Sequence, residues 1–231
     1  MTDGVLRPTL LLVHGAWHGA WCWEKLTPAL EADGWRTRAI DLPSTGPRAG
    51  TVGMHDDARA TLRALESIDG PVVVVAHSYG GIPVGQAVAK ARNVSHIVFL
   101  AAFQLDAGES LLGFLDEPEP PAQDGLHAVP DNPVALFYGD VPAADAEWAV
   151  ERLTPQSARS NSDAPTAAGW HTVPSTYILC EEDQALPPET QQVMAARSGV
   201  VHRIATGHSP FLSKPAELAE LLARIALASD G

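Results

Sequence analysis

The chain has 231 residues, 45% of them hydrophobic, so it is long enough to bury a core and fits one domain of ordinary globular size. Its 28 acidic and 15 basic residues give a net charge of −13 with neutral histidines, which argues against nucleic acid and anionic membranes as partners. No apolar run approaches the roughly 18 to 20 residues of a membrane span. Residues 1–20 show no signal-peptide pattern, and Cys22 and Cys180 lack the spacing of a disulfide scaffold or a metal site. We therefore expect a cytoplasmic protein.

Short apolar runs rich in β-branched residues recur along the chain and alternate with stretches of helical character. We expect strands at 9–13, 36–40, 72–76, 97–101, 176–179 and 201–204. We expect helices at 20–32, 56–68, 81–91, 189–197 and 216–227. Continuous apolar strands are typical of a parallel sheet that is covered on both faces. The pattern therefore predicts an α/β fold, a three-layer α/β/α sandwich with a mostly parallel six-stranded sheet.

Residues 103–174 interrupt this alternation. The segment holds 9 of the 19 prolines and no convincing buried strand. Its one clear helical stretch is 143–153, and 118–121 reads as a loop. We expect a single domain, 1–231, in which 103–174 is a cap or lid inserted over a pocket. A surface excursion without a function is the alternative.

The run 72–76 leads into a turn with a serine at its centre. Residues 76–80, A-H-S-Y-G, fit a small-x-Ser-x-Gly pattern, in which small flanking residues permit a tight and strained turn. Ser78 would then project its hydroxyl from the carboxyl edge of the sheet, where the N–H groups of the next helix face developing negative charge. An ordinary strand-to-helix turn is the alternative, because Ala76 departs from the strict glycine pattern.

Two polar side chains late in the chain also follow expected strands. Asp183 comes after 176–179 and His208 after 201–204, so both share with Ser78 the strand ends where ligands bind in parallel sheets. A serine hydroxyl needs a base to take its proton and a carboxylate to orient that base. We therefore expect Ser78 as nucleophile, His208 as base and Asp183 as acid.

Three other carboxylates compete for the role of the acid. Asp106 also follows a strand and is the reserve candidate. Glu181 and Glu182 are expected to point into solvent. Asp183 is preferred over them because it lies furthest into its loop.

A loop dense in glycine and alanine, H-G-A-W-H-G-A-W at 14–21, follows the first strand. An oxyanion hole needs two backbone donors aimed at one point, and small residues let the backbone approach the substrate. The N–H groups of Ala16 and Tyr79 are the expected pair. The spacing of His14 and His18 suggests zinc, but no acidic third ligand lies nearby, so we expect no metal. The residues expected to line the substrate pocket are Gly15, Trp17, His77, Phe103 and Trp148.

Four motifs in this order make the chain resemble the small α/β-hydrolases, the group of plant methyl-ester esterases of the salicylate-binding type, hydroxynitrile lyases and their bacterial esterase relatives. The matching stretches are VHGAWHGAWCW at 13–23, AHSYGG at 76–81, YILCEED at 177–183 with the following Pro187, and GHSP at 207–210. The similarity covers nearly the whole chain except the cap. The resemblance implies a triad of Ser78, Asp183 and His208, with the amides of Ala16 and Tyr79 as the oxyanion hole.

Two positions separate esterase from lyase within this group. Lyases of this fold resemble each other in a threonine after the first histidine and a lysine after the catalytic one, and this chain has Gly15 and Ser209 there. Without a cation to stabilise departing cyanide, ester hydrolysis is favoured. We expect a cofactor-free serine hydrolase that cleaves a small, fairly apolar carboxylic ester through an acyl-enzyme.

Other functions for the same pocket remain alternatives. They are a hydroxynitrile-lyase-like, lactonase or decarboxylase activity, and a non-catalytic small-molecule binding protein on the hydrolase scaffold. The expected partner in each case is a small molecule. No phosphate-binding or dinucleotide-binding glycine motif occurs in the chain, so the use of a nucleotide or dinucleotide has no support. The oligomeric state stays open, and a homodimer is one alternative.

Overall fold

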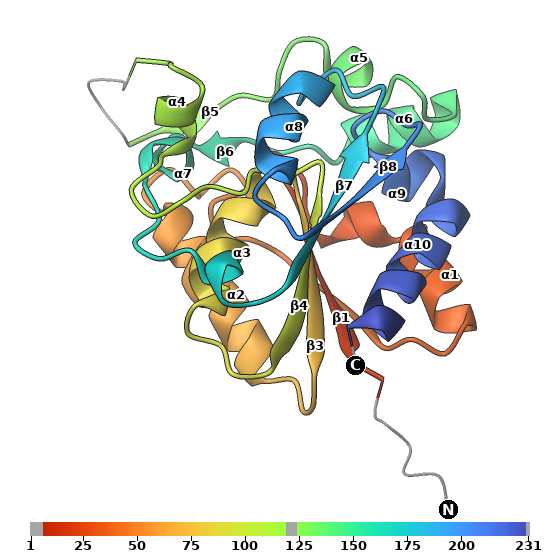
Figure 1. The fold of residues 1–231 in the computed structure, drawn as a ribbon. Coiled ribbons are helices and arrows are strands. Elements are labelled where there is room, and N and C mark those ends of the chain that lie inside the picture. The colour runs from red at the N-terminus through yellow and green to blue at the C-terminus, as the bar shows by residue number, and fades with distance from the viewer. Residues whose placement is uncertain (1–6, 119–123, 230–231) are drawn as a thin grey trace, which may run out of the picture.

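A sheet of six parallel strands forms the centre of the computed structural model, which describes residues 7–118 and 124–229 (Figure 1). The strands are β1 (Thr9–Val13), β2 (Thr37–Ile40), β3 (Val72–His77), β4 (Val94–Leu100), β7 (Ser175–Cys180) and β8 (Val200–Ile204). Their order across the sheet is β2-β1-β3-β4-β7-β8, and every neighbouring pair is parallel. The predicted fold class is confirmed, and all six predicted strands are present.

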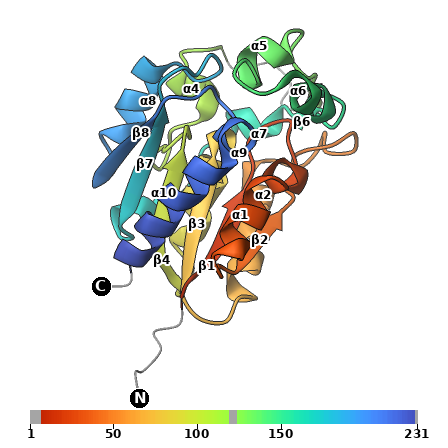
Figure 2. The same ribbon diagram turned by 90° about the vertical axis from the view of Figure 1, so that its right-hand side faces the viewer.

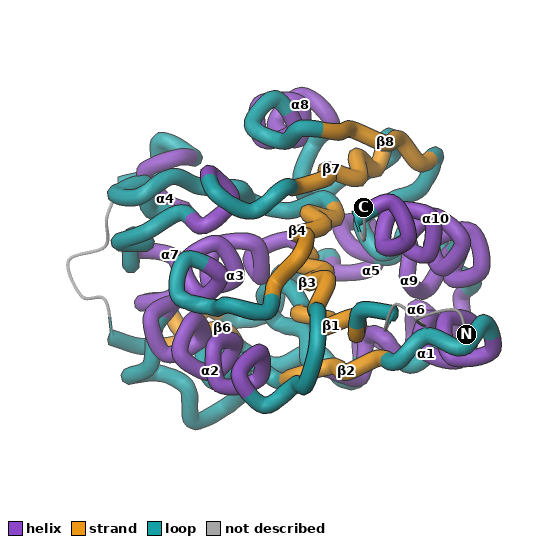
Figure 3. Tube along the Cα trace, turned by 60° about the horizontal axis from the view of Figure 1, so that its bottom comes forward, coloured by secondary structure: helices purple, strands orange, loops and turns teal. Residues whose placement is uncertain are grey.

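Helices cover both faces of this sheet, as Figure 3 shows end on. The five main helices are α1 (Leu26–Ala32), α2 (Met54–Glu66), α3 (Gly81–Val88), α8 (Pro188–Ala195) and α10 (Pro215–Ala228). Successive strand residues point to opposite faces, so Leu10 and Leu12 pack with α1 and α10, whereas Leu11 and Val13 pack with α2, α3 and α8. This double burial explains why the strands read as continuous apolar runs. None of the helices in the described ranges is long and apolar enough to cross a bilayer.

The predicted helix 20–32 is in fact two helices. A short 3-10 helix, η1 (Ala20–Trp23), precedes α1. Pro28 explains the break, because it has no N–H for the carbonyl of Glu24 and its ring would collide with that carbonyl in a continuous helix. In the observed arrangement Pro28 lies in the first turn of α1, where no N–H partner is required.

Short elements occupy the chain between β4 and β7. They are α4 (Leu111–Phe114), β5 (Leu126–His127), α5 (Pro133–Phe137), α6 (Ala143–Val150), β6 (Gln156–Ser157), α7 (Arg159–Ser162) and η3 (Gly169–His171). Figure 2 shows α5 and α6 above the carboxyl ends of the strands. The helix predicted at 143–153 is present as α6, but the other short helices and the small buried strand β6 were not expected, because pieces of two to five residues are too short to show a period. The expected loop 118–121 lies, apart from Pro118, outside the described residues.

Candidate active site

Ser78 lies at the turn from β3 into α3, on the short 3-10 helix η2 (Ser78–Gly80). Its φ of +53° is in the left-handed region, which a residue with a side chain adopts only when its surroundings impose it. Two glycines permit the turn: a Cβ on Gly80 would collide with the carbonyl oxygen of His14, and one on Gly81 with that of Phe103. Close packing therefore holds Ser78 at the carboxyl edge of the sheet.

His208 and Asp183 are in contact at the same edge. His208 Nδ1 lies 2.7 Å from Asp183 Oδ2, and both side chains are buried. Asp183 Oδ1 accepts two backbone N–H groups of its own loop, at 2.8 and 2.9 Å, and Gln191 Nε2 donates to Oδ2 at 3.1 Å. Because Nδ1–H is donated to the carboxylate, Nε2 is the ring nitrogen left to take a proton.

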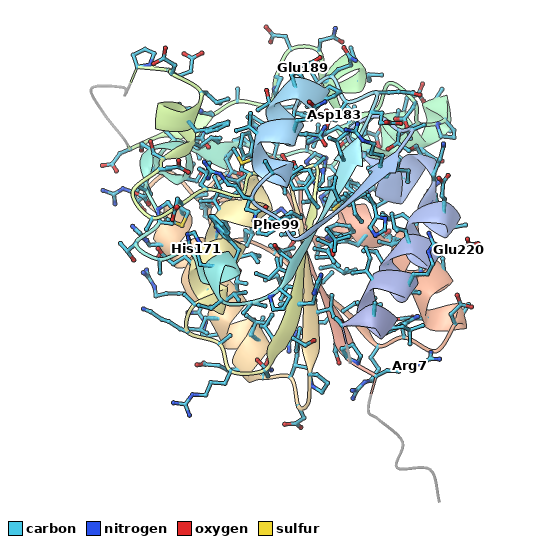
Figure 4. The ribbon with its side chains drawn as sticks, viewed as in Figure 1. Arg7, Phe99, His171, Asp183, Glu189 and Glu220 are labelled. Carbon is cyan, nitrogen blue, oxygen red and sulfur yellow. The ribbon has the colours of Figure 1, made fainter. Side chains whose placement is uncertain are left out.

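The reserve acid, Asp106, lies elsewhere. Its carboxylate is on the surface, with Oδ1 3.1 Å from His171 Nε2. Figure 4 labels His171 on the flank of the molecule and Asp183 near the carboxyl ends of the strands. The two glutamates that precede Asp183 are exposed, as expected. The structure thus brings Asp183, and not its competitors, to the histidine.

Ser78 and His208 line one cavity of about 230 Å³. Most of the lining is apolar and includes Trp17, Phe103, Leu111, Leu136, Phe137 and Leu186. Among the described residues no hydrogen bond joins Ser78 Oγ to His208 Nε2, and such contacts often form only when a substrate binds. A larger hollow, about 490 Å³, lies at the opposite end of the strands, beside Ser95 and Thr176. Ligands of open parallel sheets bind at the carboxyl ends of the strands, so the smaller cavity is the better candidate for the substrate site.

Two of the five residues expected in the pocket line this cavity, namely Trp17 and Phe103. The expectation for Trp148 is corrected. Helix α6 turns its ring toward Trp21, with ring centroids 5.4 Å apart, and Arg152 covers its face at 4.4 Å. The sequence indicates an aromatic residue on a helix here, but the direction of the ring depends on how α6 packs.

The other two, His77 and Gly15, lie behind the nucleophile rather than in the cavity lining. His77 is fully buried and donates Nε2–H to the backbone carbonyl of His208 at 2.9 Å. A Cβ on Gly15 would lie 2.8 Å from the Cβ of Ser78, so only glycine allows the loop after β1 to approach so closely. Both residues therefore act on the positions of their neighbours.

His14 and His18 hold the backbone of the loop after β1. His14 donates Nδ1–H to Gly15 O at 2.7 Å and accepts a backbone N–H at Nε2. His18 donates Nδ1–H to Ala16 O at 2.7 Å and accepts the hydroxyl of Tyr138 at Nε2. Burial lowers the pKa of both rings, that of His18 to about 3, so both are neutral. All four ring nitrogens are engaged within the protein, which leaves none for zinc.

The expected oxyanion donors, Ala16 and Tyr79, both line the cavity with Ser78. The bond from His14 to Gly15 O fixes the peptide that carries the N–H of Ala16, and within the described chain that N–H has no acceptor. The N–H of Tyr79 belongs to the first turn of η2, where N–H groups lack partners inside the helix. Both amides thus remain available beside the serine.

Sequence reasoning missed a buried polar network beside these donors. Its members are Asp57 on α2, Ser44 in the loop after β2, Gln156 on β6 and the hydroxyl of Tyr79. They are far apart along the chain, so no spacing links them. The one available signal is Asp57 itself, the only charged residue on the buried face of α2.

The chain is similar to known proteins over almost its whole length. A family model described as "Alpha/beta hydrolase family" matches residues 10–221. Methylesterase 9 of Arabidopsis thaliana is 34% identical to this chain, and the match covers 94% of this chain and 97% of the methylesterase. Norfluorocurarine synthase 1 of a Strychnos species is 31% identical, over 97% of each chain. The crystal structure of a methylesterase from Arabidopsis has a TM-score of 0.83 and 26% identity, covering 96% of this chain and 99% of that one.

Proposed function

Because this chain belongs to the alpha/beta hydrolase family, we propose that it hydrolyses small, apolar carboxylic esters through a covalent acyl-enzyme. The observation that carries the proposal is the 2.7 Å contact between His208 Nδ1 and Asp183 Oδ2, at a cavity that His208 shares with Ser78. A hydroxyl, an imidazole and a buried carboxylate in this order are what acyl transfer by a serine requires. The methylesterases among the relatives agree with this chemistry.

In the first half of the reaction, Ser78 Oγ attacks the ester carbonyl while His208 Nε2 takes the hydroxyl proton. The electron pair of the carbonyl moves to its oxygen, where the N–H groups of Ala16 and Tyr79 stabilise the negative charge. The bond to the alkoxy group then breaks, and His208 returns its proton to the departing alcohol. Asp183 holds the imidazole in the tautomer that makes this possible.

In the second half, water replaces the alcohol. His208 Nε2 takes a proton from water as its oxygen attacks the acyl carbon, and the same two amides hold the charge again. The bond between the acyl carbon and Ser78 Oγ breaks, and the proton returns to the serine. The products are a carboxylic acid and an alcohol, and the enzyme is restored without a cofactor.

The lining of the cavity indicates which esters fit. Its described residues include no lysine, arginine, aspartate or glutamate. A charged acyl or alcohol group would therefore lose its hydration without an ionic partner, which is costly. The volume of about 230 Å³ restricts the substrate further, to a small ester. Asn161 adds a polar side chain to a wall that is mostly apolar away from the catalytic residues.

The segment 103–174 acts as the cap of this pocket in the proposal, within a single domain of 1–231. Several lining residues come from it, among them Phe103, Leu111, Leu136 and Asn161. The choice of substrate thus depends on this segment, whereas the chemistry depends on the strand ends. Cys22 and Cys180 are free thiols, which agrees with the proposed cytoplasmic setting.

A matched pair of esters tests the proposal. Methyl butanoate and monomethyl succinate differ mainly in a terminal carboxylate, and we expect acid and methanol in equal amounts from the first and much slower release from the second. The measurement is product quantification within a screen of methyl, aryl and short-acyl esters, with a cyanohydrin included. Release of cyanide and aldehyde without ester cleavage would instead identify a lyase, and faster cleavage of the charged ester would contradict the apolar specificity.

A further inference from the structure

The carboxylate of Asp57 is buried beneath the nucleophile turn and is surrounded by donors. Tyr79 donates its hydroxyl to Oδ2 at 2.6 Å. Ser44 donates its backbone N–H to Oδ1 at 2.9 Å and its hydroxyl to Oδ2 at 2.5 Å. Asp57 and Ser44 are fully buried, and Tyr79 is 1% exposed. The phenol of Tyr79 is therefore anchored to α2 as well as to its own turn.

Gln156 extends this network to the loop after β1. Its Nε2 donates to Ser44 Oγ at 2.7 Å and to Ser160 Oγ at 2.9 Å. Its Oε1 accepts the backbone N–H of Trp17 at 3.2 Å and the hydroxyl of Thr45 at 3.0 Å. The Gln156 side chain is fully buried and uses both amide hydrogens and its oxygen. A continuous hydrogen-bonded chain thus runs from the hydroxyl of Tyr79 to the backbone of Trp17.

The bond from Gln156 completes the fixation of one peptide. In the peptide that joins Ala16 to Trp17, the oxygen accepts Nδ1–H of His18 and the N–H donates to Gln156. Trp17 has a φ of +61°, a conformation unfavourable for a residue with a side chain. External bonds must therefore hold it there, and the N–H of Ala16 belongs to the peptide directly before this one, which joins Gly15 to Ala16.

The two ends of the network are the two segments that carry the oxyanion donors. These donors, at residues 16 and 79, come from different strand ends, so nothing along the chain sets their separation. We propose that Asp57 and Gln156 are positioning residues that fix the N–H of Tyr79 and the N–H of Ala16 relative to each other. The inference rests on the proposed function, because it concerns the oxyanion hole of that reaction.

The protonation of Asp57 fits this role. Burial raises its pKa to about 6 and the neighbouring Asp56 also raises it, while the hydrogen bonds from Ser44 and Tyr79 lower it. Above that pH the group is a carboxylate that can accept all three donors. A buried and fully satisfied network of this kind is rigid, since each bond broken would leave a polar group without water or partner.

Two substitutions cut the network at different points. Tyr79→Phe removes the hydroxyl that reaches Asp57 and leaves the oxyanion amide in the chain. Gln156→Met keeps the length of the side chain and removes the acceptor of the Trp17 N–H. We expect each to lower kcat by about 10- to 100-fold with KM unchanged, because loss of a whole oxyanion donor costs about 10²- to 10³-fold. Tyr177→Phe is the matched control, since it removes another buried hydroxyl, bound to Ala102 O at 2.9 Å.

A trifluoromethyl ketone separates positioning from loss of stability. Ser78 Oγ adds to its carbonyl carbon, the serine proton passes to His208, and the carbonyl electron pair becomes an oxyanion in the hole. We expect the affinity for this ketone to fall by the same factor as kcat in both variants, while the affinity for the product acid stays near that of the wild type. The melting temperature should fall in both, because the broken bonds leave buried polar groups unpaired, so the assays are run well below it. Tyr177→Phe should also lower the melting temperature but leave kcat and both affinities unchanged.

Three outcomes would overturn the inference. The first is a fall in kcat without a fall in ketone affinity, and the second is an equal effect of Tyr177→Phe. The third is that Tyr79→Phe and Gln156→Met keep the kcat and the ketone affinity of the wild type. That result would contradict the positioning role but would not affect the proposed function. A wild-type protein that neither cleaves esters nor binds the ketone covalently would remove both.

Discussion

Replacing Ser78 by alanine is expected to lower kcat for ester hydrolysis by about 10⁴-fold or more. The substitution removes the atom that forms the acyl-enzyme, and the remaining oxyanion hole and binding site retain only a small part of the catalysis. No neighbouring group can replace this hydroxyl. The hydroxyl of Tyr79 points away to Asp57, and the imidazole of His77 points to the backbone carbonyl of His208. The measurement is kcat for the best ester of the screen, with melting curves to check the fold.

Ser213→Ala is the control for this change. Its hydroxyl lies in α9 (Pro210–Ser213), where it is buried and has no hydrogen-bond partner among the described residues, so its loss removes the same atom from another packed site. We expect activity equal to that of the wild type. An Ser78→Ala protein that cleaves the ester at the rate of the wild type would show that the reaction does not use this serine.

Asp183→Asn is expected to cost about 10³- to 10⁴-fold in kcat. The two backbone N–H groups that bind Oδ1 would hold the amide oxygen of the asparagine at that position. The NH₂ group of the asparagine would then take the place of Oδ2, which in the wild type contacts His208 Nδ1 and Gln191 Nε2. The imidazole would have to accept at Nδ1 and carry its proton on Nε2, the tautomer that cannot take a proton from Ser78.

Asp106→Asn tests the competing assignment under the same conditions. Asp106 is bound to His171 on the surface, so we expect its substitution to leave kcat unchanged. A large loss in that variant, together with a tolerated Asp183→Asn, would reverse the assignment of the acid.

The sheet was predictable because its strands are buried on both faces. The run at 72–75 is apolar at every position and fully buried, which is what a central parallel strand requires. The first helix was predicted less well, although Pro28 marks in the sequence the point where a continuous helix must break. The short elements between β4 and β7 could not be predicted, because their limits depend on contacts with the rest of the protein rather than on a period.

The candidate site shows the same division. Ser78, Asp183 and His208 each follow a strand, so topology alone brings them to one edge, and the structure adds the 2.7 Å contact between the last two. The roles of His14 and His18 in holding backbone carbonyls had no signature beyond their spacing. Networks that join side chains distant in sequence require the packing of α2 against the cap segment, which a single sequence does not reveal.

Covalent labelling with a fluorophosphonate reports directly whether His208 activates Ser78. A serine activated by a histidine forms a bond from its oxygen to phosphorus and expels fluoride, whereas an unactivated serine reacts negligibly. We expect a single adduct, found by peptide mass spectrometry on Ser78, that is present in Ser213→Ala and absent from Ser78→Ala. An unlabelled wild-type protein, or an adduct confined to another serine, would contradict this expectation.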